Sequence, residues 1–382
     1  MRKAIVWFMS EDKTASPPPL AEAFAKWIDA QREAISLVEA AQHAGHPEEW
    51  AEGYRWVTRI AGLAQKWAVE ADDPLHPEIY LLQDASRKLL VDNPDVNYYF
   101  VRLDENETYR LTGNRGSAAS VGLTVGTDFM RGASGAMGTV GQFELDDFSL
   151  DPNGDYEIII SRERHEGNWI PLGEGAAQIA VRETFQDRSA ETPASYQVER
   201  LGDPVPPPVL TPQLCAERIE NAAKLLLFIV RAALAISLGH RANQNVISGA
   251  AGQDFVDEQD DEVATHSSTH MAYQGGSWHL GPDEGLSVTI RPPRGGALYW
   301  GITLVNVWTE SYEYRYSPTA TNNKLATANA DGSWTLVIAP RDPGSPNWLD
   351  TGGRDEGVAL IRWVHPASLP PNPSCEVIRI AT

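Results

Sequence analysis

Two segments of this chain, NWIPLGEG from Asn168 and NWLDTGGR from Asn347, begin with the same Asn-Trp pair. Each pair follows an acidic turn with a glycine and a run of branched apolar residues. Each pair also precedes a second apolar run that contains an arginine. Because a repeated pattern of this length predicts the same local structure twice, it constrains the architecture more than any other feature of the sequence.

The distance between the two copies is nearly constant. It is 178, 179 and 180 residues for three landmarks, which are Gly154 with Gly332, Trp169 with Trp348, and Arg182 with Arg362. So long a period predicts a duplicated domain, because the repeats of solenoid proteins recur every 20–50 residues or so. Around each landmark, apolar and polar residues alternate and Pro or Gly clusters interrupt the alternation, which predicts about eight short strands in each copy.

The regions outside the two copies have helical patterns. Apolar residues recur at helical spacing over 20–38, again after Pro47, and over 77–90. The segment GDPVPPPVLTP then leads into a long apolar helix over 214–239. This helix contains Arg231 and is shorter than a typical span, so we expect a buried connector and not a membrane helix.

These patterns predict a mainly β protein with α. We expect tandem antiparallel jelly-roll or β-sandwich domains, an N-terminal helical region and a linking helix. The expected segments are 1–92 for the helical region, 93–205 for the first sandwich, 206–262 for the linker with its helix and an acidic loop, and 263–382 for the second sandwich.

Several segments resemble the bacterial domain-of-unknown-function family 1214, which often occurs with the related family 1254. They are DNPDVNYY, YRLTGNRG, GNWIPLGEGAAQIAVRETFQD and DGSWTLVIAPRDPGSPNWLDTGG. The resemblance is strongest over 265–365, looser over 90–202, and absent from the N-terminal helices. It implies tandem jelly rolls that assemble as trimers, similar to viral capsid subunits and to some glycan-active enzymes, and it implies no particular activity.

Charge and motif content exclude several kinds of function. The formal net charge is −21 and no basic cluster occurs, so nucleic acid and anionic membranes are not expected partners. The chain has no phosphate-binding loop and no GxSxG motif. Its two cysteines cannot form a zinc site alone. No cofactor is expected, and the short apolar run near the N-terminus predicts a cytoplasmic protein.

The candidate site consists of carboxylates near Trp, Asn and Arg, the residue types that bind sugars and other polar rings. Glu310 and Asp350 are the candidate acid/base pair of a glycosidase-like hydrolase. The candidate ligand-binding residues are Asn306, Trp308, Asn347, Trp348, Arg362, Tyr99 and Arg115. His266 and His270 are weak candidate metal ligands, because their spacing matches no metal motif.

Each candidate also has a structural interpretation. The Asn amide can bind the local backbone and the Trp can cap the sandwich core. Glu310 and Asp350 can form ion pairs with Arg315 or Arg362. Three functions therefore remain open: an enzyme acting on a glycan or polar small molecule, a non-catalytic binding module for such a ligand, and a structural protein whose aromatic residues fill the interfaces of a homo-oligomer, expected to be a trimer.

Overall fold

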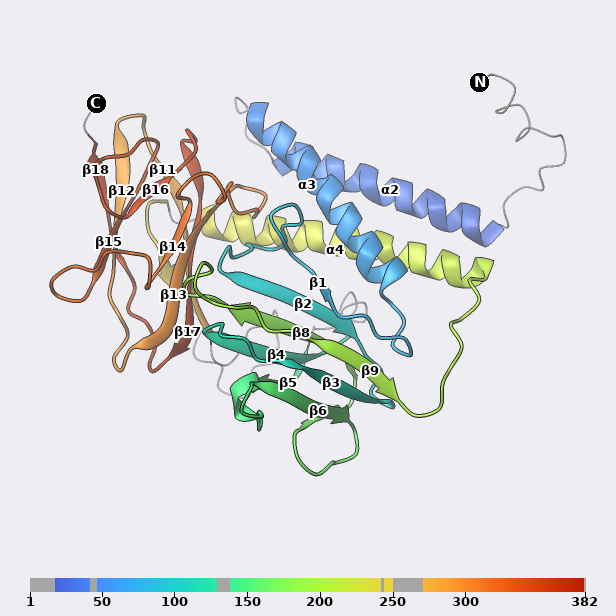
Figure 1. Cartoon of the computed structure of the whole chain (residues 1–382). Coiled ribbons are helices and arrows are strands. Elements are labelled where there is room, and N and C mark those ends of the chain that lie inside the picture. Colours follow the sequence, from blue (N-terminus) through green and yellow to red (C-terminus); the bar gives the residue numbers. More distant parts are fainter. Residues whose placement is uncertain (1–17, 42–46, 129–137, 242–243, 250–270, 381–382) are drawn as a thin grey trace, which may run out of the picture.

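The computed structural model describes residues 18–41, 47–128, 138–241, 244–249 and 271–380 (Figure 1). These residues form four β-sheets and three long helices, so the predicted fold class of tandem β-sandwiches with helices is confirmed. Figure 1 shows the helices along one side of the first sandwich, with the second sandwich at their end.

The first sandwich consists of a five-stranded and a four-stranded sheet. The five-stranded sheet has the order β1-β2-β8-β4-β5, with strands Tyr80–Leu81, Val96–Arg102, Ala176–Thr184, Ser120–Thr127 and Thr139–Glu144. The four-stranded sheet has the order β7-β6-β3-β9, with strands Trp169–Pro171, Asp155–Ser161, Thr108–Asn114 and Gln197–Leu201. Their facing sides enclose a core that includes Leu111, Val121, Ile158 and Val181, each at most 2% exposed.

The second sandwich repeats this topology strand for strand. Its five-stranded sheet has the order β10-β11-β17-β13-β14, with strands Ser248–Gly249, Met271–His279, Glu356–Pro366, Ala297–Val305 and Ala320–Asn322. Its four-stranded sheet has the order β16-β15-β12-β18, with strands Trp348–Asp350, Trp334–Ala339, Glu284–Ile290 and Ser374–Arg379. Adding nine to each label of the first sandwich gives the label at the same place in the second, as a duplicated domain requires.

The duplication extends to the direction of pairing. Nearly all neighbouring strands are antiparallel, as expected for a sandwich. The two short strands that carry the repeated tryptophans are the exceptions: β7 pairs with β6 in parallel, and β16 pairs with β15 in parallel. In both cases the tryptophan is the first residue of the short strand.

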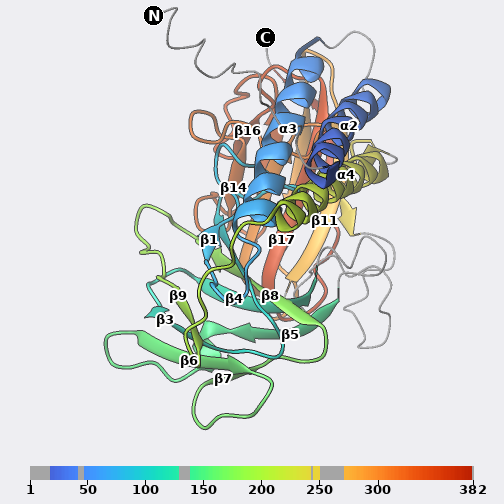
Figure 2. The same ribbon diagram turned by 90° about the vertical axis from the view of Figure 1, so that its right-hand side faces the viewer.

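The helical part consists of α2 (Pro18–Ala41), α3 (Pro47–Gln65), the π-helical turn Lys66–Glu70, and α4 (Pro212–Arg241). Figures 1 and 2 show the three long helices packed side by side. Small residues such as Ala30 and Ala34 are buried where α2 meets the others, so the helices approach closely. Tyr80 and Phe100 belong to the same apolar cluster, which therefore joins the helices to the first sandwich.

One predicted element is wrong. The helix expected over 77–90 is replaced by β1, which pairs with β2, and by a turn at Asp84. The Asp84 carboxylate accepts hydrogen bonds from the backbone N–H groups of Ser86 and Arg87, and such local bonds compete with a helix. Among the described residues, no helix is long and apolar enough to cross a membrane. The four-segment domain division stays a prediction.

Candidate functional site

Each repeated asparagine joins two parts of its own sandwich through hydrogen bonds of its side-chain amide. The Asn347 amide donates to the carbonyls of Thr327 and Thr335, both at 2.9 Å, and its oxygen accepts the Thr327 N–H at 2.7 Å. Asn168 makes the equivalent three bonds to Ser149 and Glu157. Each amide thus joins a loop to a neighbouring strand, which explains on structural grounds why the residue is repeated.

The repeated tryptophans also make equivalent bonds. The indole N–H of Trp348 donates to the carbonyl of Ala339 at 3.0 Å, and that of Trp169 donates to Ser161. Both side chains are half-buried. Because the polar edge of each indole already has a backbone partner, neither tryptophan needs a ligand to satisfy it.

The second candidate group lies in a buried turn after β13. The Asn306 amide oxygen accepts the N–H groups of Trp308 and Glu310, both at 3.0 Å, and so shapes the turn. Trp308 is 1% exposed and stacks on Trp56 of α3, with ring centroids 5.8 Å apart. Its indole N–H donates to the carbonyl of Glu49. The turn is therefore the point at which the second sandwich is bound to the N-terminal helices.

Glu310 faces the same helix. Its side chain is 1% exposed, and its carboxylate lies 2.5 Å from the Arg59 guanidinium and 3.6 Å from that of Arg55. This ion pair joins α3 to the second sandwich. The sequence had suggested pairing with Arg315 or Arg362, whereas Arg315 pairs with Glu313 on the surface.

Asp350, Tyr99 and Arg115 make contacts of their own within the sandwiches. Asp350 is half-buried and its carboxylate accepts the Gly352 N–H at 2.7 Å. Tyr99 packs its ring against Tyr196, and Arg115 forms a two-bond ion pair with Asp146. His266 and His270 lie outside the described residues. Within the described residues, no group of three or more His, Cys, Asp or Glu side chains is arranged to hold a metal ion.

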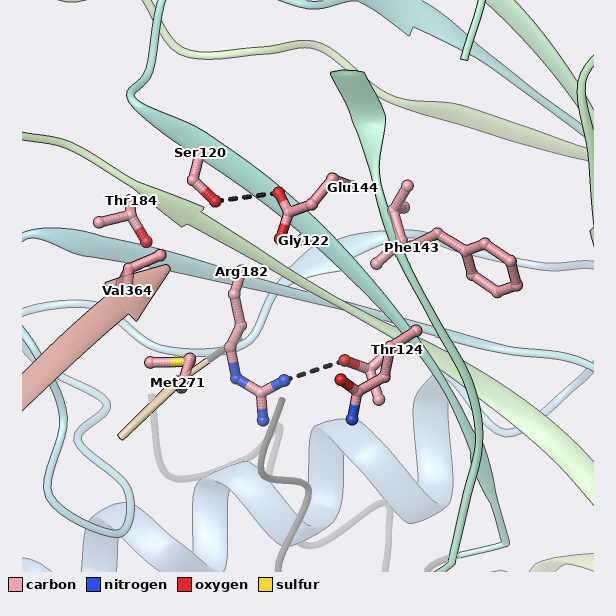
Figure 3. Close-up of a pocket in the computed structure, with 11 residues that line it drawn as sticks. Ser120, Gly122, Thr124, Phe143, Glu144, Arg182, Thr184, Met271 and Val364 are labelled. Atoms are coloured by element: carbon pink, nitrogen blue, oxygen red, sulfur yellow. Dashed lines mark hydrogen bonds between the residues drawn. The ribbon is translucent and has the colours of Figure 1, made fainter. Parts of the chain in front are cut away.

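An open hollow lies at the junction of the two sandwiches (Figure 3). The hollow is shallow, because only about 20 Å³ of it is available to the centre of a water molecule and the rest is open to solvent. Strands β4, β5 and β8 of the first sandwich form most of its lining, and Met271 and Val364 of the second sandwich close one side. None of the nine catalytic and ligand-binding candidates from the sequence lines it.

Several polar side chains interrupt the mainly apolar lining of the hollow. The Arg182 guanidinium extends along the sheet and donates to the Thr124 hydroxyl at 3.1 Å (Figure 3). At the other end the Glu144 carboxylate accepts the Ser120 hydroxyl at 3.0 Å. The hollow therefore presents one cation, one anion and several hydroxyl groups within one small space.

His365 extends this polar group toward the second sandwich. Its imidazole lies 3.2 Å from the Glu144 carboxylate, and this hydrogen bond, with the nearby charges of Glu144, Asp147 and Asp146, raises the pKa of His365 above its ordinary value. The backbone of His365 has φ of 48°, a left-handed conformation that is unfavourable for a residue with a side chain. The bond to Glu144 thus links the two sandwiches at the edge of the hollow.

The repeat places a second arginine close behind the hollow. Arg182 pairs in register with Tyr98 on β2 and Gly122 on β4, and its equivalent Arg362 pairs with Tyr273 on β11 and Gly301 on β13. Burial raises the pKa of Tyr98, and the charges of both arginines oppose that rise. Tyr98 therefore lies within electrostatic reach of both arginines of the duplicated row.

Sequence reasoning identified only part of this site. Arg182 and Arg362 were identified as landmarks of the repeat, and only Arg362 was named as a ligand-binding candidate. Ser120, Thr124 and Glu144 were missed, because no motif surrounds them. The one available signal was that Arg182 and Arg362 are the charged residues at matching positions in two apolar strands, where a charge is costly without a specific role.

Comparison with known proteins supports the fold and the family. Residues 281–368 match the family described as protein of unknown function (DUF1214). The crystal structure of an uncharacterised protein from Burkholderia cenocepacia is similar over 94% of this chain and 96% of that one, with a TM-score of 0.85 and 28% identity. A structure from Vibrio parahaemolyticus matches 91% of this chain and 100% of that one, with a TM-score of 0.46 and 11% identity. No curated protein matches the chain. The family match lies within the second sandwich, and it confirms the resemblance of this part of the chain to the DUF1214 family.

Proposed function

We propose that this protein binds a small polar molecule in the hollow between its two sandwiches. The observation that carries the proposal is the lining itself, in which Arg182, Thr124, Ser120 and Glu144 present hydrogen-bonding groups around one opening. Ligand sites typically combine a few convergent polar groups with an apolar wall, and Met271 and Val364 supply such a wall here.

The same geometry favours binding over glycoside hydrolysis. Glu310 is in a buried ion pair at the helix interface, and Asp350 accepts a hydrogen bond in a loop of the second sandwich. A glycosidase needs two carboxylates on opposite sides of one sugar. We therefore assign Glu310 and Trp308 to the attachment of the helices. A catalytic role for Glu310 and Asp350, ligand binding by the remaining candidates, a homotrimer and a cytoplasmic location stay predictions.

The proposal is tested by filling the hollow. Gly122 lines it and lies on a regular strand, and a β-carbon added there would come within 3.3 Å of the end of the Glu144 side chain. Gly122→Val is therefore expected to abolish binding while leaving the fold intact. Ser287→Val introduces the same side chain at a half-buried position on β12, a strand that contributes no residue to the lining of the hollow, and serves as the control.

The assay is a thermal-shift screen of neutral sugars, polyols, hydroxy acids and uronic acids, followed by calorimetric titration of any compound that raises the melting temperature. A ligand that binds only the native state must raise it by mass action. We expect at least one compound to bind wild type and the Ser287→Val control and to lose binding in Gly122→Val. Equal binding by all three proteins would refute the hollow as the site.

A further inference from the structure

An exposed, proline-rich linker over residues 202–213 joins β9 to α4 (Figure 1). Every residue in it is exposed, and the side chains of Val209 and Leu210 are 82% and 63% exposed. Prolines at 204 and 206–208 fix the backbone angle φ and remove N–H donors, and each residue that precedes a proline favours an extended conformation. The linker is therefore stiff and extended, and side chains from elsewhere must hold it against the fold.

Two cationic side chain types attach this linker to the first sandwich and to the loop before β1. The Arg200 guanidinium donates to the carbonyl of Asp203 at 2.9 Å, and Nε2 of His76 lies 2.8 Å from the carbonyl of Val205. Within the described part of the chain, residues 203–210 make no other hydrogen bond. Arginine stays charged at any pH that proteins meet, whereas histidine loses its proton near neutrality, so one of the two attachments depends on pH.

The geometry of His76 requires a proton on both ring nitrogens. Nδ1 lies 2.9 Å from the Asp73 carboxylate and Nε2 lies 2.8 Å from the Val205 carbonyl, and both of these partners can only accept a hydrogen bond. A neutral imidazole has a single N–H and can satisfy only one of them, so the two bonds coexist only when the ring is a cation. The bond to Asp73, followed by the bond to Val205, accordingly raises the pKa of His76 above its ordinary value.

The loop that carries His76 is fixed, and few charges surround the ring. The Asp73 carboxylate also accepts the N–H of Leu75 at 3.0 Å, and the hydroxyl of Tyr109 donates to the carbonyl of Pro74 at 3.0 Å. The charges that act on the ring are Asp73 on its own loop and Arg200 on β9, which opposes the rise in pKa and is itself paired with Glu107. On the linker, Asp203 is the only ionisable side chain.

We propose that His76 is a proton-dependent clamp on the linker: the protonated ring holds the Val205 carbonyl, and loss of the proton releases residues 204–210. In the neutral ring the Asp73 carboxylate keeps the remaining proton on Nδ1, because an ionised acceptor binds it more strongly than a carbonyl does. The lone pair of Nε2 then faces the Val205 oxygen and repels it. The attachment is therefore complete below the ordinary pKa of about 6.5 and is lost as the pH rises through the higher folded-state pKa.

The test reads the motion of the linker directly. A nitroxide label is attached through Val209→Cys in the full chain, with the half-buried Cys215 and Cys375 replaced by alanine, and its mobility is followed by electron paramagnetic resonance from pH 5.5 to pH 9. We expect the rotational correlation time to fall at least twofold as the pH rises. The midpoint should equal the pKa of His76 measured by NMR, with its resonance assigned by its absence from the spectrum of His76→Gln.

Two controls separate the clamp from a general effect of pH. In the labelled protein that also carries His76→Gln, mobility should not depend on pH, and a label at Leu325→Cys, in an exposed loop of the second sandwich, should be equally insensitive. A constant mobility of the Val209 label, the same midpoint in His76→Gln, or a His76 pKa at or below 6.5 would each overturn the proposal. Neither His76 nor the linker lines the hollow, so this result is independent of the proposed binding function.

Discussion

The buried ion pair between Glu310 and Arg59 predicts a measurable contribution of the N-terminal helices' attachment to the stability of the protein. In Glu310→Gln the side chain keeps its volume and can still accept a hydrogen bond from Arg59, but the charge is lost. Removing one partner of a buried pair costs about 3–5 kcal/mol when the remaining charge has no access to water. The Arg59 side chain is 21% exposed and can be partly hydrated, so we expect a loss of about 2–3 kcal/mol in the free energy of unfolding.

The measurement is equilibrium unfolding in urea followed by far-ultraviolet circular dichroism, which reports mainly on α2, α3 and α4. A double-mutant cycle with Arg59→Gln isolates the interaction, since the change in the double variant should be smaller than the sum of the two single changes. Glu78→Gln removes the charge of a more exposed pair with Lys66, and its stability is expected to stay close to that of wild type.

The result that would refute this reasoning is additivity. If the two single variants lower stability independently, Glu310 and Arg59 do not act as a pair, and other contacts hold the helices, such as the packing of Trp308 on Trp56 and its hydrogen bond to Glu49. If Glu310→Gln is as stable as wild type yet abolishes a measurable enzymatic activity, the structural assignment is wrong and the acid/base hypothesis is supported.

Three further predictions follow from particular positions. Burial raises the pKa of Asp72 from 3.8 to about 6. Because the folded-state pKa lies above the unfolded value, ionisation of this carboxyl group lowers the stability of the fold as the pH rises from about 4 to about 6.5. The cost is at most about 3 kcal/mol, and Asp72→Asn should remove that part of the pH dependence in urea titrations; parallel curves for the two proteins would contradict it. Asn347→Ala leaves three backbone groups without partners at a position 6% exposed and should lower stability by about 2–4 kcal/mol, more than Asn168→Ala at its half-buried equivalent; equal losses would argue against burial as the cause. Gly276→Ala places a β-carbon 1.9 Å from a backbone oxygen and should destabilise the fold, whereas Gly62→Ala in α3 meets nothing within 4 Å and should raise stability by about 0.5–1 kcal/mol; melting temperatures that change in the same direction would refute this contrast.

Much of the architecture followed from sequence alone because it depends on local pattern. The repeated Asn-Trp pairs and the landmark arginines revealed two copies of one domain, and the structure shows identical strand orders in both. The helix expected over 77–90 failed for a local reason as well, since Asp84 binds the backbone in a turn. The spacing of apolar residues there predicts a helix, but it does not show that the Asp84 side chain binds the backbone and competes with that helix.

The site was far less predictable. Glu310 and Trp308 are residue types that often line sugar sites. Only the packing of α3 against them shows that they contact a helix instead. Arg182 and Glu144 line the same hollow because β8 and β5 both lie beside β4, and that order depends on strand pairing between residues distant in sequence. No local pattern encodes the proximity of Met271 and Val364 to them.

The sequence by itself thus determined the duplicated sandwich. The alternation of apolar and polar residues and the choice of turn residues act over short distances along the chain, and both patterns occur in each copy. Only the tertiary structure decided which polar residues satisfy one another within the fold. Hydrogen-bond satisfaction depends on every neighbour in space, so Asn347 and Asn168 proved to join loops to strands within their sandwiches, while Arg182 proved to line the hollow between the two domains.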